Sequence, residues 1–152
     1  MPELQSELVF EMSLDPGEFQ DVGATPHGYR LIAPLQGGTF AGPKLKGDVL
    51  PGGADWLLTR PDGVRELDVR LTLRADDGYL IYMSYRGINT ITPEIVQRLT
   101  RGEPVDPSEY YWRSTPRFET GSEKYGWLNR IVAVSVGQRT PTGVYHRVYA
   151  IL

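Results

Sequence analysis

The chain has 152 residues, the usual size of one domain, with 16 Lys and Arg against 19 Asp and Glu and a formal net charge of −3. The absence of cysteine excludes disulfides, zinc–thiolate sites and thiol nucleophiles. The charge balance argues against bulk attraction to nucleic acid or an anionic membrane, and no apolar stretch reaches the ~18 residues of a membrane span. The amino-terminal residues do not resemble a signal peptide, so we expect one cytoplasmic domain over residues 1–152.

Apolar and polar residues alternate in short runs between clusters of Gly and Pro, which is typical of an all-β protein. The run at 65–75 is the clearest, because every second residue from Leu67 to Leu73 is apolar. Strands are predicted at residues 8–14, 29–35, 39–50, 55–60, 65–75, 79–86, 110–119, 127–137 and 145–152. The connection between 110–119 and 127–137 is short and contains glycine, so we expect these two strands to be neighbours.

One helix is predicted at 93–101. Thr92 is a good N-cap, Pro93 is a good first residue, and Gly102 ends the apolar pattern. Short strands with closely spaced turns favour a barrel or a sandwich over an α/β fold. We therefore expect an antiparallel closed β-barrel with one short helix, and a barrel of about eight strands has room for one small ligand.

Loop lengths predict how three of these strands pair. A four-residue loop at 61–64 places Asp55 opposite Arg70, and a three-residue loop at 76–78 places Asp68 opposite Arg86. In this register, Trp56 lies on the apolar face of the sheet. The other face collects Asp55, Asp68, Arg70, Thr72, Tyr82 and Arg86. That polar face is either solvated, with weakly interacting charge pairs, or it lines a polar cavity that binds a ligand.

A second cluster of candidate site residues comes from the carboxy-terminal third of the chain. Its members are Tyr111, Arg113, Glu119, Tyr125, Trp127 and Asn129. Aromatic rings of this kind stack on a planar ligand, and an arginine binds its anionic group. The alternative interpretation is an ordinary barrel core whose polar tips bind the backbone.

Neither a metal nor a cofactor is expected. The two histidines, His27 and His146, lack the spacing of metal ligands. The chain also has no P-loop, no GxSxG pattern and no GxGxxG pattern. The glycines at 37–42 are therefore interpreted as turn and close-packing residues.

Six segments in order carry a resemblance to a known family: GGTFAGP at 37–43, LPGGADW at 50–56, ELDVR at 66–70, SEYYWR at 108–113, PRFET at 116–120 and WLNR at 127–130. Together they resemble the family called domain of unknown function 3237, over nearly the whole chain. The resemblance implies a closed antiparallel barrel of lipocalin-like type. It implies no particular reaction.

Three functions remain open. The first is a cofactor-independent enzyme (an isomerase, cyclase, hydratase or lyase) acting on a small oxygenated molecule. In it, Glu119 or Asp55 would be the base, Tyr125 or Tyr111 the acid, and Arg113 with Asn129 would stabilise developing negative charge. The second is a carrier of a small organic ligand, and the third is a structural protein without a ligand. A carboxylate of raised pKa inside a pocket favours the enzyme, an apolar pocket the carrier, and a filled barrel the third.

The partner most expected besides a small ligand is a second copy of the chain. Residues 131–136 are apolar on both faces of their strand, apart from one serine. One face would enter the barrel, and the other must be covered by the helix or by another subunit. We therefore expect a homodimer with Val132 or Val134 near its interface. A nucleic-acid partner is disfavoured, since the aromatic residues have no surrounding basic excess.

Overall fold

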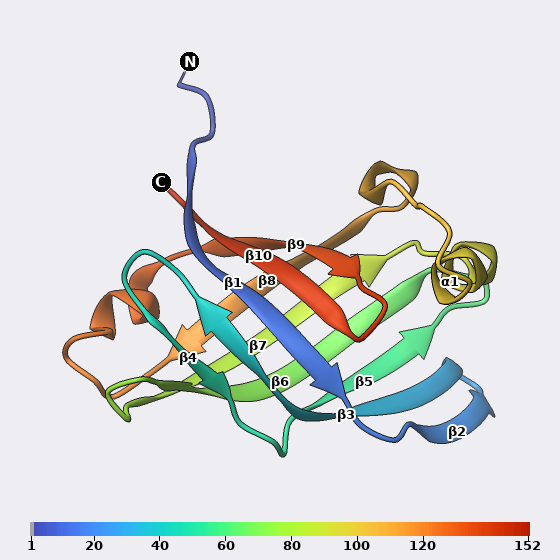
Figure 1. Ribbon diagram of the computed structural model, residues 1–152, viewed down its shortest axis with the longest axis horizontal. Helices are drawn as coiled ribbons and strands as arrows, with labels where there is room; N and C mark the ends of the chain where they lie inside the picture. The colour runs from blue at the N-terminus through green and yellow to red at the C-terminus, as the bar shows by residue number, and fades with distance from the viewer. Residues whose placement is uncertain (1) are drawn as a thin grey trace.

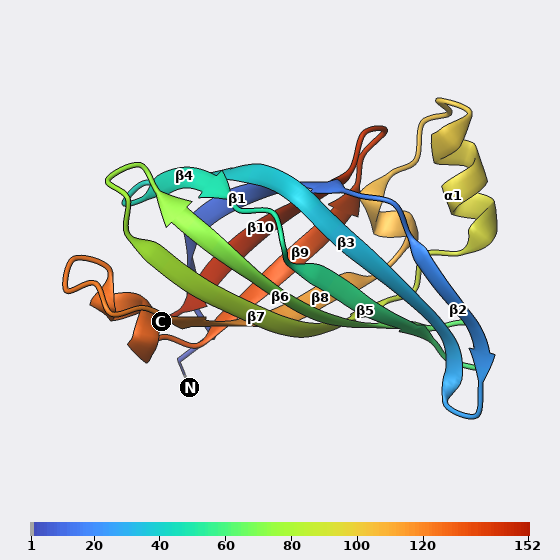
Figure 2. The same cartoon turned by 90° about the horizontal axis from the view of Figure 1, so that it is seen from below.

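Eight strand positions close into an antiparallel barrel in residues 2–152, the part of the chain that the computed structural model describes (Figures 1 and 2). The order is β1-β10-β9-β8-β7-β6, then β4 and β5 sharing one position, then β3, which pairs back onto β1. The strands are β1 (Ser6–Pro16), β2 (Gln20–Thr25), β3 (Gly28–Ala41), β4 (Lys46–Val49), β5 (Ala54–Thr59), β6 (Arg65–Ala75), β7 (Leu80–Asn89), β8 (Trp112–Glu119), β9 (Ala133–Arg139) and β10 (Val144–Ile151). The predicted all-β barrel is confirmed.

The predicted helix is also confirmed, as α1 (Pro93–Thr100). The Thr92 hydroxyl accepts a hydrogen bond from the backbone N–H of Ile95 at 3.2 Å, and Gly102 takes a positive φ of 76° just after the helix. Two short 3-10 helices, η1 (Pro107–Glu109) and η2 (Gly126–Arg130), complete the fold. Figures 1 and 2 place α1 at one end of the barrel and η2 at the other. None of the helices in residues 2–152 is long and apolar enough to cross a membrane.

Three elements differ from the sequence-based prediction. Residues 127–130 belong to η2 rather than to a strand, and β2 was not predicted. The turn expected at Gly37-Gly38 is absent from β3, which runs through both glycines. Gly38 has a φ of 153°, and a Cβ there would lie 2.1 Å from the backbone oxygen of Ser13. Glycine is therefore required where β3 approaches β1 to close the barrel.

One of the two predicted hairpin registers is confirmed. In β6–β7, Asp68 lies opposite Arg86 and Arg70 opposite Ser84, and the Arg86 Nη2 is 3.8 Å from the Asp68 Oδ2. The β5–β6 register was wrong by one residue, because Asp55 lies opposite Val69 and not Arg70. That shift moves Asp55 to the opposite face of the sheet from the one predicted.

The turn explains the shift. The Arg60 N–H donates to the carbonyl of Val64 at 2.9 Å, which leaves three residues in the loop instead of four. The last of them, Gly63, adopts a left-handed φ of 85°, as expected in a three-residue hairpin loop. Asp55 therefore points into the barrel with Val69, and Trp56 points outward.

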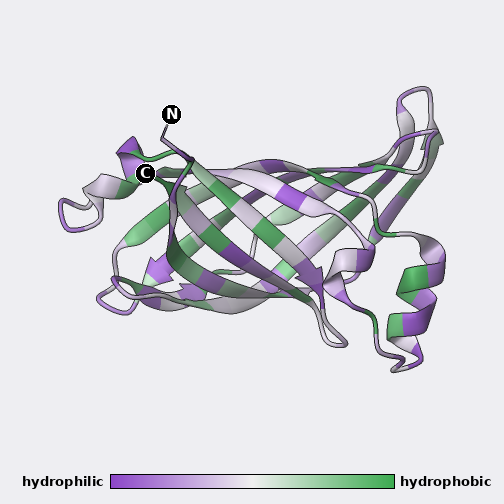
Figure 3. Cartoon of the chain, turned by 90° about the horizontal axis from the view of Figure 1, so that it is seen from above, coloured by the Kyte–Doolittle hydropathy of each residue, from purple (hydrophilic) through white to green (hydrophobic). Residues whose placement is uncertain are grey.

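The interior is packed at one end and hollow at the other. Hydrophobic and hydrophilic residues alternate along the strands (Figure 3), and the apolar face of β6 and β7 turns inward. At the η2 end, the ring of Phe10 packs edge-on against Phe40 at 5.4 Å and Phe118 at 5.9 Å between centroids. Leu73 and Ile81 are fully buried in the same core. Apolar burial of this kind is the main stabilising term of the fold.

The strands β8 and β9 are neighbours, as predicted from their short connection. On their inner faces the hydroxyls of Ser114 and Ser135 form a buried hydrogen bond to each other. On the outside, Val132 is 71% exposed at the start of β9. The homodimer expected over this face stays a prediction.

Gly137 in β9 supports the wall at the hollow end. A Cβ at this position would lie 2.6 Å from the indole Nε1 of Trp112, so the ring rests directly on the glycine. We predict that Gly137→Ala lowers the free energy of unfolding in urea by ~1–3 kcal/mol through overpacking. The matched control is Gly121→Ala, whose Cβ would meet nothing within 4 Å. The control should stay within ~0.5 kcal/mol of wild type. Equal unfolding midpoints for the two variants would show that the indole does not depend on Gly137.

Candidate functional site

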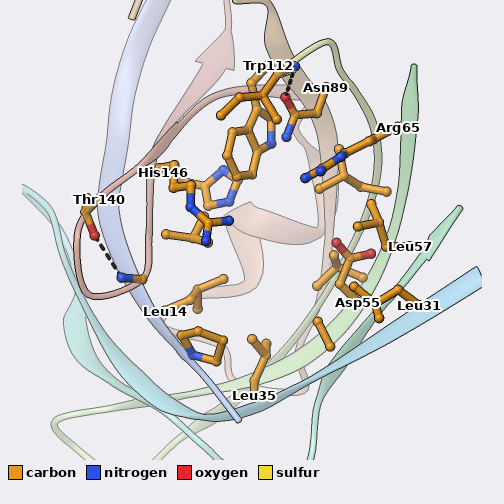
Figure 4. A pocket seen from close by; sticks show the side chains of 18 of the residues that line it. Leu14, Leu31, Leu35, Asp55, Leu57, Arg65, Asn89, Trp112, Thr140 and His146 are labelled. Carbon is orange, nitrogen blue, oxygen red and sulfur yellow. Dashed lines mark hydrogen bonds between the residues drawn. The ribbon is translucent and has the colours of Figure 1, made fainter. Parts of the chain in front are cut away.

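The hollow end of the barrel contains a cavity of about 240 Å³ (Figure 4). It opens where β7 leads to α1 and where the β9–β10 hairpin turns, and its lining comes from strands all around the barrel. Leu14, Leu31, Leu35 and Leu57 form apolar wall. The volume is just below the ~300–1,000 Å³ that is typical of ligand pockets, so the cavity suits a small molecule.

Asp55 is the carboxyl group of this cavity. β5 carries it on the inner face, and Figure 4 shows its carboxyl group pointing into the space. Loss of hydration raises the pKa of Asp55 to about 6, and the charge of Asp68 adds to the rise. A hydrogen bond from the backbone N–H of Asp68, at 3.1 Å, and the charge of Arg30 act in the opposite direction. Burial dominates because, within residues 2–152, no cation forms an ion pair with this carboxylate.

Tyr85 in β7 lies level with Asp55 in β5, with β6 between them. Val69 pairs with Asp55 on one side and with Tyr85 on the other, so all three side chains share the inner face. Tyr85 is 4% exposed. Burial, and then the negative charge of Asp55, raise the pKa of its phenol well above the usual range. The hydroxyl therefore keeps its proton and is a proton donor for a ligand in the cavity.

His146 and Trp112 form the wall opposite Asp55. The imidazole of His146 packs edge-on against Trp112 and against Tyr85, each at 5.5 Å between ring centroids. Complete burial lowers the pKa of His146 to about 4, so the ring is neutral at physiological pH. Its Nδ1 and the Nε1 of Trp112 are both buried without a hydrogen-bond partner in residues 2–152.

Three more polar side chains line the upper part of the cavity. Asn89 accepts a hydrogen bond from the backbone N–H of Ile91 at 2.9 Å through its side-chain oxygen. Its NH₂ group is left for a ligand. Arg65 and Arg139 bring two guanidinium groups to the same region. No group of three His, Asp or Glu residues in the described part of the chain could hold a metal ion.

The first predicted cluster lies mostly outside the barrel. Asp68, Arg70 and Arg86 are on the outer face, as is Trp56, whose ring lies 5.7 Å below the Arg70 guanidinium. The solvated interpretation of that face was therefore correct for Asp68, Arg70 and Arg86. Trp56 was predicted on the apolar face, and the register shift places it outside instead. Asp55 is the one member that enters the cavity, because of the register shift. The expected Asp55–Arg70 charge pair is not formed.

The second predicted cluster is dispersed. Glu119 is exposed on the outer face of β8, and Arg113 and Tyr111 are also outside, where the guanidinium lies 4.9 Å from the ring. Tyr125 is buried at the other end, with its hydroxyl donating to Asp77 at 2.9 Å. Trp127 lies 5.0 Å from the Lys44 ammonium. Asn129 accepts a hydrogen bond from the Thr120 N–H at 2.8 Å, a structural contact.

Five residues that line the cavity were not predicted as site residues from the sequence: Arg65, Tyr85, Trp112, Arg139 and His146. Tyr85 did fall on the apolar face, and that face was the inner one. His146 carried a usable signal too, since it alternates with Val144 and Val148 on the core side of the last strand. The two arginines gave no pattern in the sequence, because they stand at the ends of strands that lie far apart in the chain.

The raised pKa of Asp55 has a consequence for stability. In the unfolded chain the carboxyl group ionises near ~3.9. In the folded barrel it ionises at about 6. Between these values the folded protein binds the extra proton, so the contribution of Asp55 to stability falls as pH rises. Above about pH 6 the buried charge destabilises the fold.

We predict that the unfolding free energy of Asp55→Asn rises relative to that of wild type as pH rises. The difference between the two proteins should grow by ~1–3 kcal/mol from about pH 4 to about pH 8. Asparagine keeps the acceptor for the Asp68 N–H and removes the buried charge. His146 titrates in the opposite sense, but it is common to both proteins and cancels in the difference. Urea unfolding at both pH values measures the effect. A constant difference between the two proteins would contradict it.

Comparisons with known proteins agree on the fold. The family model described as "Protein of unknown function (DUF3237)" matches residues 4–151. A UPF0311 protein of Rhodopseudomonas palustris is 36% identical over 151 residues, 99% of each chain. The solved structure of a β-barrel-like protein from Acinetobacter baumannii has a TM-score of 0.86 at 38% identity and covers 100% of this chain and 98% of that one.

A third relative carries the name of an activity. The hydroalkoxylation enzyme phnH of Penicillium herquei is 32% identical over 128 residues, which are 84% of this chain and 70% of that protein. The match of the family model over nearly the whole barrel, together with these relatives, establishes that the chain belongs to the DUF3237 family.

Proposed function

We propose that this protein is an acid–base enzyme acting on a small oxygenated molecule. It adds the O–H bond of a hydroxyl group across a carbon–carbon double bond, or catalyses the reverse elimination. Asp55 is the proton-transfer group of this proposal. The observation that carries it is a carboxyl group inside the barrel cavity, with a pKa raised to about 6. Carboxyl groups poised close to neutral pH are typical of general acids and bases.

The surroundings of Asp55 fit proton transfer better than a structural role. A structural buried carboxylate is normally paired with a cation, whereas the partner of Asp55 within residues 2–152 is the backbone N–H of Asp68. One of its oxygens is therefore available to a ligand. The protonated Tyr85 hydroxyl lies on the same face. A ligand in the cavity meets a base and a hydrogen-bond donor together.

The name of the Penicillium herquei relative supports the class of reaction. Hydroalkoxylation adds an O–H bond across a C=C bond. In the proposed step, the Asp55 carboxylate takes the proton of a substrate hydroxyl, and the oxygen of that hydroxyl forms a bond to the alkene carbon. The π electrons move to a conjugated carbonyl oxygen, where Arg65 and Arg139 stabilise the charge. Asp55 then returns the proton to the adjacent carbon, so no atoms are gained or lost. The reverse sequence is an elimination.

A non-catalytic carrier is the second candidate, and the leucine-rich wall of the cavity favours it. A carrier needs the volume and the apolar surface but has no use for the ionisation of Asp55. The two functions therefore predict opposite effects of a change at this residue.

The test uses 2-hydroxyphenyl propenyl ketone, which closes to a methylchromanone by adding its phenol to the conjugated double bond. We expect the wild-type protein to accelerate this closure over buffer and to give one enantiomer in excess. We expect Asp55→Asn to lose at least about 100-fold of the rate, the usual contribution of a general base, while still binding the ketone. The wild-type rate should rise with pH through about 6, where Asp55 ionises.

The matched control is Asp48→Asn, the same chemical change at an exposed position of β4 on the outer face of the barrel, with the rate expected to stay near wild type. An Asp55→Asn variant as active as wild type would overturn the proposal. A wild-type protein that binds the ketone without accelerating its closure would favour the carrier.

A further inference from the structure

Two arginines line the open end of the cavity. Arg65 is the first residue of β6 and Arg139 the last residue of β9, and both line the cavity. Within residues 2–152 neither guanidinium forms an ion pair. Arg60 and Arg98, by contrast, form ion pairs with carboxylates at the surface.

The two guanidinium groups destabilise each other's charge. Loss of hydration, and then repulsion from Arg139, lower the pKa of Arg65. Two like charges in a partly buried site repel each other more strongly than they would in water. An anion placed between them would remove the repulsion and replace the lost hydration with charge-assisted hydrogen bonds.

A second observation points to a ligand at this end of the cavity. Buried polar atoms normally have a hydrogen-bond partner, yet the described part of the chain, residues 2–152, supplies none to the Nε1 of Trp112 or the Nδ1 of His146. In Figure 4, Trp112, His146 and Arg65 lie around the upper part of the cavity, and Asp55 lies lower, below Arg65 on the same side. Val69, the pairing partner of Asp55, is four residues further along β6 than Arg65. The charged end of a ligand held here would therefore be kept away from the Asp55 carboxylate.

We propose that the molecule bound in the cavity is a small organic carboxylate, held through its two oxygens by Arg65 and Arg139 with its apolar body against the leucine wall. A guanidinium group donates two parallel hydrogen bonds that match the two oxygens of a carboxylate. A neutral amide has one oxygen and cannot accept both bonds. That this carboxylate is also the substrate rests on the function proposed for Asp55. Conjugation of the double bond to the carboxylate would bring the developing charge to the arginine pair.

The test is isothermal titration calorimetry at about pH 8, where Asp55 is ionised, with cinnamate and with cinnamamide. The two probes have nearly the same size and differ in charge. We expect cinnamate to bind wild type about tenfold or more tightly than cinnamamide, the usual advantage of a charged hydrogen bond. Arg65→Gln and Arg139→Gln should each remove most of that advantage and leave cinnamamide affinity unchanged.

Two controls separate charge at the site from charge and folding in general. Arg117→Gln removes one positive charge from the exposed outer face of β8 and should leave cinnamate affinity at the wild-type value. Arg65→Lys keeps the charge in the cavity and should restore part of the affinity that Arg65→Gln loses. Unchanged cinnamamide binding shows that the cavity of each variant is intact.

Equal affinities of wild type for the two probes would overturn the carboxylate proposal, as would a failure of cinnamate to bind. An equal loss in Arg117→Gln would overturn it too. The Asp55→Asn variant distinguishes this failure from that of the proposed function. It should bind cinnamate at least as tightly as wild type, since a negative charge has left the cavity. If turnover depends on Asp55 but ligand binding does not depend on the two arginines, only the carboxylate proposal is refuted. The opposite result would refute only the role of Asp55.

Discussion

The turn between β5 and β6 decides what the cavity contains. The hydrogen bond from the Arg60 N–H to the Val64 carbonyl leaves a three-residue loop, and Gly63 supplies the left-handed backbone that such a loop requires. With one more residue in the loop, Asp55 would face solvent beside Arg70, and Trp56 would enter the barrel. Because side chains alternate along a strand, a one-residue change of register would remove the carboxyl group from the cavity altogether.

Burial then gives that carboxyl group its chemistry. The Asp55 side chain is surrounded by leucines and a buried tyrosine and has no ion-pair partner in residues 2–152, so desolvation outweighs its hydrogen bond to the Asp68 N–H. The same environment acts on the opposite wall, where burial keeps His146 neutral. The Nδ1 of this ring has no hydrogen-bond partner among residues 2–152. Positive charge is confined to the mouth, on Arg65 and Arg139. The cavity is thus divided into a basic rim, a proton-transfer group and an apolar wall, the arrangement expected of a site that orients one end of a small ligand.

The barrel could be predicted from sequence because its signals are local. Alternation over 65–75, the Thr92 cap and the short 76–78 loop each act within a few residues, and the structure confirms all three. The site could not be predicted in the same way, because it is assembled from the ends of strands distant in the chain. Asp55 was a candidate, but its orientation depended on one residue of loop length. Glu119 had suitable neighbours in sequence and still lies outside, since β8 turns Trp112 and Ser114 inward instead.

Asp55 ionises with difficulty inside the cavity, and the proton transfer proposed for it depends on this property. Carbon-13 NMR of the aspartate side-chain carboxyls, with the Asp55 signal assigned by its absence in Asp55→Asn, measures this directly. We expect this resonance to titrate with a midpoint at about 6. A midpoint of ~3.9, the value of a solvated aspartate, would show that Asp55 is not desolvated and would contradict its role in proton transfer.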